Sequence, residues 1–175
     1  NAISLSSMVF AFAAMLALIG KIYLLAAVLI QMRLLCNLFD GMVAIEFAQK
    51  TKSGEIYNDA PDRPADIFIL LGAGYALFSV PHGAELGWLA ALLAVLTAYV
   101  RNLGVAAGAS PYFIGPMAKQ HRMATITVAS ILVFFEARTF ATDYTLAVAL
   151  VVICLGSFFT LFRRLGRIVT ELESL

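Results

Sequence analysis

Six long apolar runs constrain the fold of this chain more than any other feature of its sequence. A run of about twenty apolar residues can cross a bilayer as a helix, and within lipid a helix pairs all the backbone amides of its segment. The chain is 62% hydrophobic and 13% charged, which is more apolar than a soluble domain of 175 residues needs to be. The sequence therefore predicts an all-α integral membrane protein with six transmembrane helices, in one domain over residues 1–175. The expected spans are about 2–19, 22–49, 64–80, 86–103, 123–135 and 145–162.

The placement of basic residues predicts the orientation of these spans. Cytoplasmic loops of membrane proteins are enriched in Lys and Arg. Most basic residues here fall after the second, fourth and sixth spans, whereas Lys21 and Arg138 fall on the other side and Arg33 lies within the second span. We therefore expect a multi-pass protein of the cell (inner) membrane, with both chain ends and any site in residues 37–66 on the cytoplasmic face. The net charge of +1 gives no indication of nucleic-acid binding.

The C-terminal segment after Phe162 has apolar residues at helical spacing and is expected to lie along the membrane surface. In that position Arg163, Arg164 and Arg167 would face anionic lipid head groups. We interpret these three residues as surface anchors.

A polar stretch, residues 37–66, interrupts the apolar sequence. Its first part has four residues at spacings that share one face of a helix, namely Asn37, Asp40, Gly41 and Ala44. A carboxylate such as Asp40 is costly in an apolar helix unless it pairs or binds a cation. Gly41 and Ala44 leave that face bare, so a ligand or another helix can come close. The alternative for Asp40 is a helix-end residue at the water interface.

The second part of this stretch holds three more oxygen ligands. Asn58, Asp62 and Asp66 would share a face of the next helix if that helix begins before Asn58. Pro61 and Pro64 disfavour helix at the residues that precede them. The alternative is therefore a helix that begins near Asp62, with the Asp62 carboxylate capping it by accepting backbone N–H bonds.

Carboxylate and amide oxygens that converge from two helices suit a hard divalent cation such as Mg²⁺ or Mn²⁺. Such ions serve phosphoryl transfer by neutralising phosphate oxygens and orienting the groups that react. A site of this kind at a membrane surface suggests a substrate with phosphates at one end and lipid at the other.

With these residues the chain resembles the CDP-alcohol phosphotransferases, whose signature D-x2-D-G-x2-A-R-x8-G-x3-D-x3-D lies across the second and third of six spans. The matching positions are Asp40, Gly41, Ala44, Gly54 and Asp62. Asn37 and Asn58 stand where the signature has Asp, and Ile45 stands where it has Arg. The resemblance covers essentially the whole chain.

A second register of this motif is also open. The segment "DRPAD" resembles the Asp-Pro-x-x-Asp ending of many family motifs. In that register Asp62 and Asp66 would be the last two acids, and the connecting loop would be four residues longer. The first register is preferred because it accounts for Gly54, and Asp62 is used in both.

The resemblance implies a transferase of phospholipid biosynthesis. A CDP-linked lipid, such as CDP-diacylglycerol, would bind with its pyrophosphate at a metal site of one or two Mg²⁺ (or Mn²⁺) ions. The hydroxyl of an alcohol acceptor, which the sequence does not name, would attack the lipid-side phosphorus, and CMP would leave. The resemblance also implies a homodimer in the bilayer. A small transporter is disfavoured, because it would need ionisable residues deep in several spans.

The resemblance also implies a role for each matching position. Asp62 would be the catalytic base, or Asp66 in the second register, and Gly41, Ala44 and Gly54 would leave room for CDP. The metal-ligand positions are Asp40, Asp62, Asn37, Asn58 and Asp66. The two Asn residues remove two negative charges, so the site attracts a dication less strongly. The alternative function is therefore a catalytically impaired family member that binds a nucleotide-lipid or a protein partner.

Three basic residues, Arg101, Lys119 and Arg122, lie near the same membrane face as the polar stretch. One interpretation is that they anchor the cytoplasmic side. The other is a basic pocket for the phosphate of the acceptor or the lipid head group, to which the fork of an Arg side chain is suited. Both interpretations stay open from the sequence.

Overall fold

The computed structural model describes residues 2–46, 59–78 and 80–174, and the side chains within 6–39, 59–78 and 80–174. Its helices, in chain order, are α1 (Ala2–Ile19), α2 (Tyr23–Glu46), α4 (Asp62–Ala76), α5 (Gly83–Ala106), α6 (Lys119–Thr139) and α7 (Tyr144–Leu172). No strand occurs in the part of the chain that the structure describes, so the predicted all-α fold is confirmed.

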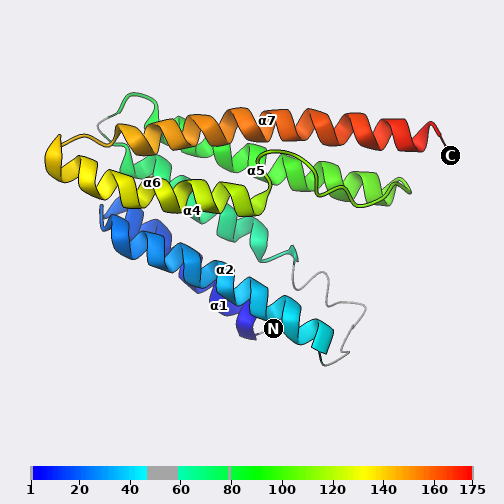
Figure 1. The fold of residues 1–175 in the computed structure, drawn as a ribbon, viewed down its shortest axis with the longest axis horizontal. Helices are drawn as coiled ribbons and strands as arrows, with labels where there is room; N and C mark the ends of the chain where they lie inside the picture. The colour runs from blue at the N-terminus through cyan, green and yellow to red at the C-terminus, as the bar shows by residue number, and fades with distance from the viewer. Residues whose placement is uncertain (1, 47–58, 79, 175) are drawn as a thin grey trace.

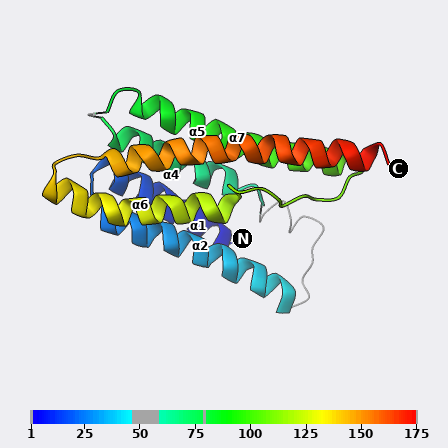
Figure 2. The ribbon, with the colours of Figure 1, turned by 45° about the horizontal axis from the view of Figure 1, so that its top comes forward.

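The described helices pack in a closed ring in which each helix makes its main contacts with two neighbours. The order around the ring is α1, α2, α6, α7, α5, α4 and back to α1, and α4 also contacts α7. The turns that join α1 to α2, α4 to α5, and α6 to α7 lie at one end of the bundle (Figure 1). The α5–α6 connection and the C-terminus lie toward the other end, as the turned view in Figure 2 also shows. The starts of α4 and α6 therefore meet at this second end.

Each predicted span corresponds to one of these helices, and the largest difference lies in the last. One unbroken helix, α7, runs to Leu172 (Figure 1), whereas the sequence predicted a span that ends near residue 162 and continues into a tail along the membrane surface. That prediction is wrong because the extension of α7 packs against α5. A Cβ added at Gly104 of α5 would lie 2.6 Å from Ile168 Cδ1, and Ile168 also packs in one apolar cluster with Val100.

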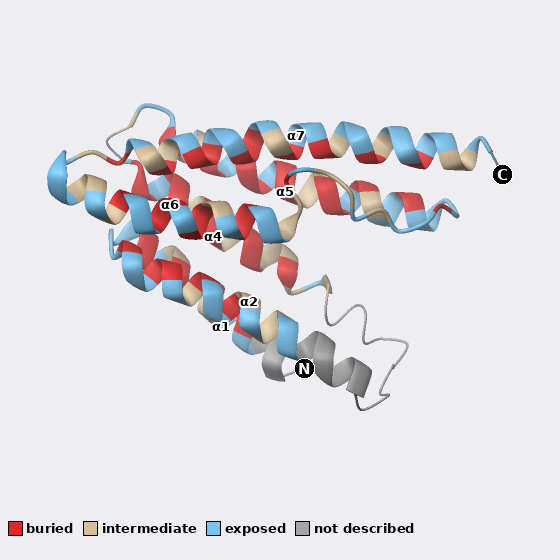
Figure 3. Ribbon diagram, in the orientation of Figure 1, coloured by how far each residue is buried: buried red, intermediate tan, exposed pale blue. Residues whose placement is uncertain are grey.

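The outside of the ring is apolar as well as its interior. Buried residues face inward and exposed residues face outward (Figure 3). Large apolar side chains on the outside include Leu92 of α5, 57% exposed, and Leu155 of α7, 68% exposed. Soluble proteins rarely expose such a surface, which supports a location in lipid. Among the described residues two helices, α5 and α7, are long and apolar enough to span a membrane, so six transmembrane spans and a single domain stay predictions.

Two glycines set the distance between α4 and α5. A Cβ added at Gly87 would lie 2.8 Å from the Cα of Gly74, so the two backbones are in direct contact. We expect Gly87→Ala to lower the free energy of unfolding by about 1–3 kcal/mol, because the new methyl must push the helices apart. Thermal unfolding in detergent measures this change. Gly166→Ala is the matched control, since nothing lies within 4 Å of a Cβ there. Equal effects of the two variants would contradict the close contact.

Candidate active site

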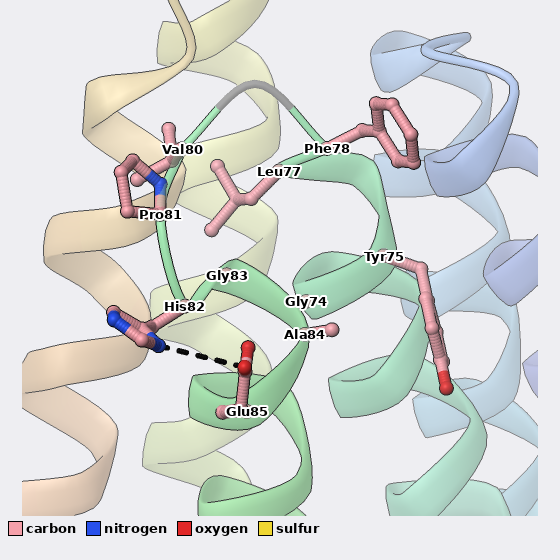
Figure 4. A pocket seen from close by; sticks show the side chains of 10 residues that line it. All are labelled: Gly74, Tyr75, Leu77, Phe78, Val80, Pro81, His82, Gly83, Ala84 and Glu85. Atoms are coloured by element: carbon pink, nitrogen blue, oxygen red, sulfur yellow. Dashed lines mark ion pairs between the residues drawn. The ribbon is translucent and has the colours of Figure 1, made fainter.

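Charged side chains gather in a cavity at the end of the bundle where α4 and α6 begin. The cavity has a volume of about 330 Å³. Helices α4, α5, α6 and α7 all contribute charged residues to its lining, and Asp59 lies just before α4. The charged lining residues are Asp59, Asp62, Arg63, Arg101, Lys119, Arg122 and Arg164. Another hollow, of about 400 Å³, lies at the α4–α5 turn (Figure 4). The ion pair in this hollow, between His82 and Glu85, is exposed to solvent. The first cavity gathers many more charged side chains, so it is the candidate active site.

The way α4 begins brings Asp62 and Asp66 into this site. The carbonyl of Pro61 accepts the Ala65 N–H at 3.2 Å, and Pro64 falls in the first turn, where its missing N–H is tolerated. Asp62 and Asp66 are one turn apart, so they share one face of α4, and both are buried. Because α4 begins at Asp62, the predicted start near Asp62 is right, and a start before Asn58 is wrong. The capping role of Asp62 is also wrong, because no side chain caps α4 and the Asp62 oxygens accept bonds from α2 and α6.

Asp62 is the carboxylate that connects the buried network with the cavity. Its Oδ1 accepts bonds from Asn37 Nδ2 at 2.9 Å and from Arg33 Nη2 at 3.2 Å, both on α2. Its Oδ2 accepts a bond from Lys119 Nζ at the start of α6. The Asp62 side chain lines the cavity and is 12% exposed, so a substrate in the cavity could meet this carboxylate.

Asp66 lies one turn deeper and does not line the cavity. Its Oδ1 is 2.7 Å from Arg33 Nη2, and its Oδ2 is 2.8 Å from Arg122 Nη2. Arg122 also donates from Nη1 to the carbonyl of Met117 at 2.9 Å, which fixes the chain just before α6. Asp66 therefore holds two arginines in place from behind the cavity.

Arg33 is a site residue that the sequence analysis did not single out. It is fully buried on α2, one turn before Asn37, and it contacts both Asp62 and Asp66. A buried Arg in an apolar helix is costly unless it is paired. That cost, together with the i, i+4 spacing to Asn37, is the sequence signal that would have placed Arg33 in the site.

Arg101 and Asp59 lie at the rim of the cavity. Arg101 Nη2 is 2.9 Å from Asp59 Oδ2, and Arg63 Nη2 is 2.5 Å from the same oxygen. Burial raises the pKa of the Asp59 carboxyl, but the two guanidinium groups outweigh it and hold this pKa below its usual value. The Arg101 guanidinium also lies over the ring of Phe113, 4.7 Å from its centroid. Arg101 is thus held at the cavity mouth on two sides.

Arg164 also belongs to the site, and its interpretation as a surface anchor is wrong. It is 5% exposed, and it donates from Nη1 to the carbonyl of Thr97 at 2.7 Å and from Nε to the carbonyl of Ile114 at 2.9 Å. These bonds tie α7 to α5 and to the α5–α6 connection. Arg163 and Arg167 are exposed, so their interpretation as anchors stays a prediction.

The structure brings most of the predicted and described site residues together. One network of hydrogen bonds and ion pairs contains Asn37, Asp62, Asp66, Lys119 and Arg122. Arg101 is not in direct contact with that network but lines the same cavity.

Other predicted site residues lie outside this description. The backbone of residues 40–46 belongs to α2, but their side chains are not among the described ones, which leaves out Asp40, Gly41 and Ala44. Gly54 and Asn58 also lie outside the described residues. The roles of these five residues, and the choice between the two registers, therefore stay predictions.

The described residues do not fit a divalent cation bound by Asp62 and Asp66. Within the ranges that the structure describes, no three His, Cys, Asp or Glu side chains gather closely enough to hold a metal ion. All four carboxylate oxygens of the two Asp residues face Arg or Lys nitrogens. Five basic and two acidic side chains line the cavity, so its chemistry suits an anion such as phosphate.

The fold has a counterpart among solved structures. It is similar to the crystal structure of Mycobacterium tuberculosis phosphatidylinositol phosphate synthase with CDP-DAG bound, with a TM-score of 0.81 over 97% of this chain and 86% of that chain. The chain has the fold of a CDP-alcohol phosphotransferase. The two sequences are 15% identical, and no protein-family model and no curated protein matches the chain. The CDP-alcohol phosphotransferase fold that the motif predicted is therefore confirmed, while the site is described by this chain's own contacts.

Proposed function

We propose that the protein transfers a phosphatidyl-type group from a CDP-linked lipid, such as CDP-diacylglycerol, to an alcohol and releases CMP. The observation that carries this proposal is the position of Asp62, a carboxylate that reaches a cationic cavity in this fold. The similar solved protein is a synthase with CDP-DAG bound. In the proposed complex the phosphates of the nucleotide-lipid lie among the basic side chains of the cavity, and its acyl chains follow the apolar outside of the helices.

In the proposed reaction Asp62 is the general base. An entering phosphate draws Lys119 away from Asp62 Oδ2, which frees that oxygen to accept the proton of the acceptor hydroxyl. The acceptor oxygen bonds to the lipid-side phosphorus while the bond from that phosphorus to the CMP oxygen breaks, and CMP leaves with the electron pair. Lys119 and Arg122 stabilise the charge on the phosphate oxygens. Asp66 is less suited as the base, because arginines hold both its oxygens behind the cavity.

The expected Mg²⁺ or Mn²⁺ ion is a separate part of this proposal. When bound, such an ion would supply neutralisation of the pyrophosphate oxygens. Asp62 and Asp66 do not fit it, so the expectation of one or two ions depends on Asp40 and Asn58, whose side chains lie outside the described residues. No step of the proposed reaction is routed through the ion.

We also propose that the acceptor carries a phosphate, because Arg101 adds a cation at the cavity mouth beyond those that face Asp62. Arg101→Met is expected to raise the KM for a phosphorylated alcohol about 10–100-fold, since a charge-assisted bond to phosphate is lost. Steady-state CMP release against acceptor concentration measures this.

Arg138→Met is the matched control for that change. Arg138 lies over the Phe134 ring, as Arg101 lies over Phe113, but it lies at the other end of the bundle. An equal rise in KM for both variants, or for a phosphate-free alcohol with Arg101→Met, would contradict the acceptor assignment.

A panel of alcohols tests the proposed activity itself. The purified protein in vesicles with CDP-diacylglycerol should release CMP with at least one phosphorylated or unphosphorylated alcohol. The second candidate is a protein that binds the nucleotide-lipid without turnover, favoured by the ion pairs that occupy every oxygen of Asp62 and Asp66. It predicts binding of CDP-diacylglycerol with no CMP release from any acceptor.

The cellular setting is part of the proposal. The apolar exterior of the helices supports the bilayer as the location. We place the cavity on the cytoplasmic face of the inner membrane, where soluble acceptors are available, and retain a homodimer as the expected assembly. Basic residues at this end of the bundle support that orientation through the positive-inside rule.

A further inference from the structure

The guanidinium of Arg33 lies between the carboxylates of Asp62 and Asp66. Its Nη2 atom is 2.7 Å from Asp66 Oδ1 and 3.2 Å from Asp62 Oδ1, and it also lies 3.4 Å from the Asp62 carbonyl oxygen. One nitrogen of α2 thus bridges two carboxylates of α4, which come from successive turns of that helix.

The remaining oxygens of the two carboxylates are held in the same way by α6. Lys119 pairs with Asp62 Oδ2, and Arg122 pairs with Asp66 Oδ2 at 2.8 Å. The pair of acids therefore contacts three basic side chains from two other helices. Asn37, which stands where the motif has Asp, donates its amide N–H to Asp62 instead of adding a negative charge.

The charge of this cluster opposes the binding of a divalent cation. Two carboxylates face three cations, so the cluster is already positive by one charge. Arg33 is wholly buried, and the Asp66 and Arg122 side chains are each 3% exposed. A metal ion between the two acids would have to displace this buried guanidinium, and a buried charge separated from its partners is strongly unfavourable.

We propose that Arg33 is the permanent counter-ion of this site, and that Asp62 and Asp66 consequently bind no divalent cation. The chain then uses Arg33, Lys119 and Arg122 to balance the two acids, and the site recognises phosphate with protein cations. This inference concerns the chemistry of the two acids and does not depend on whether transfer to an alcohol occurs.

A Mn²⁺ titration of the full chain in detergent, followed by the EPR signal of free Mn²⁺, tests the proposal. Asp62→Asn and Asp66→Asn should each leave the number of bound ions and their affinity unchanged within about twofold, including the case in which no variant binds Mn²⁺. A loss of one ion, or a fall in affinity of at least about tenfold as expected when a metal site is disturbed, would overturn it.

A double-mutant cycle in EDTA gives an independent test that does not require each variant to be fully stable. Arg33→Met and Asp66→Asn should each lower Tm. In the charge-balanced double variant the fall in Tm should be no more than half the sum of the two single falls. Lys21→Met combined with Asp66→Asn is the control, since Lys21 pairs with the distant Asp143. Additive losses for Arg33 and Asp66, as in the control pair, would overturn the counter-ion assignment.

Discussion

Asp62→Asn is expected to lower the rate of CMP release about 10²–10⁴-fold, the usual contribution of a general base. The amide keeps the size of the side chain and its contact with Asn37 but cannot take the acceptor's proton. Binding of CDP-diacylglycerol should change much less, because Arg122, Lys119 and the other cations of the cavity remain. Initial rates at saturating acceptor, together with the Kd of the lipid, separate the two effects.

Asp143→Asn is the matched control for this prediction. Asp143 is also a buried carboxylate in an ion pair, with Lys21, and it accepts a bond from the Tyr23 hydroxyl at 2.7 Å. It lies at the opposite end of the bundle, so its substitution can affect stability but not proton transfer. Comparable losses of rate in the two variants would mean that Asp62 acts through stability, and the general-base assignment would be wrong.

Arg164→Met is expected to destabilise the protein by about 1.5–3 kcal/mol, since hydrogen bonds to charged groups contribute this much. The bonds to Thr97 and Ile114 join α7 to α5 and to the connection that leads into α6. Their loss should also lower the rate of CMP release, because Lys119 and Arg122 follow that connection. Chemical unfolding and activity, measured on the same preparation, check both effects.

The chain supplies two controls for this variant within a few residues. Arg163 and Arg167 lie on the same helix and are exposed, so Arg163→Met and Arg167→Met should change stability by no more than about 0.5 kcal/mol. If all three substitutions have the same small effect, Arg164 is an anchor like its neighbours, and its place in the site is wrong.

The helices were predictable because lipid allows few alternatives. Apolar runs of sufficient length indicated where each helix lies, and the prolines around Asp62 indicated where α4 begins. The alternative role of Asp62 as a cap is wrong for a tertiary reason. Its partners, Arg33 and Lys119, come from α2 and α6, and the spacing within α4 carries no information about which helices pack on either side.

The role of Arg164 was missed because residue type and neighbourhood do not distinguish it from Arg163 and Arg167. Helical phase does distinguish it. Ser157, Thr160 and Arg164 continue the buried face of α7, as does Ile168 one turn further on. The apolar run that predicts the last span ends at residue 162, whereas the buried face continues into the charged segment that follows. The motif, in contrast, identified Asn37 and Asp62, which are in direct contact.

One measurement tests the central claim most directly. The purified protein in vesicles with CDP-diacylglycerol and its best acceptor is quenched at intervals, and CMP and the new phospholipid are quantified from the same samples. Transfer at the Asp62 cavity predicts that the two products form in a one-to-one ratio and that both fall together in Asp62→Asn. CMP without a new phospholipid, or neither product with any alcohol despite binding of CDP-diacylglycerol, would contradict the account.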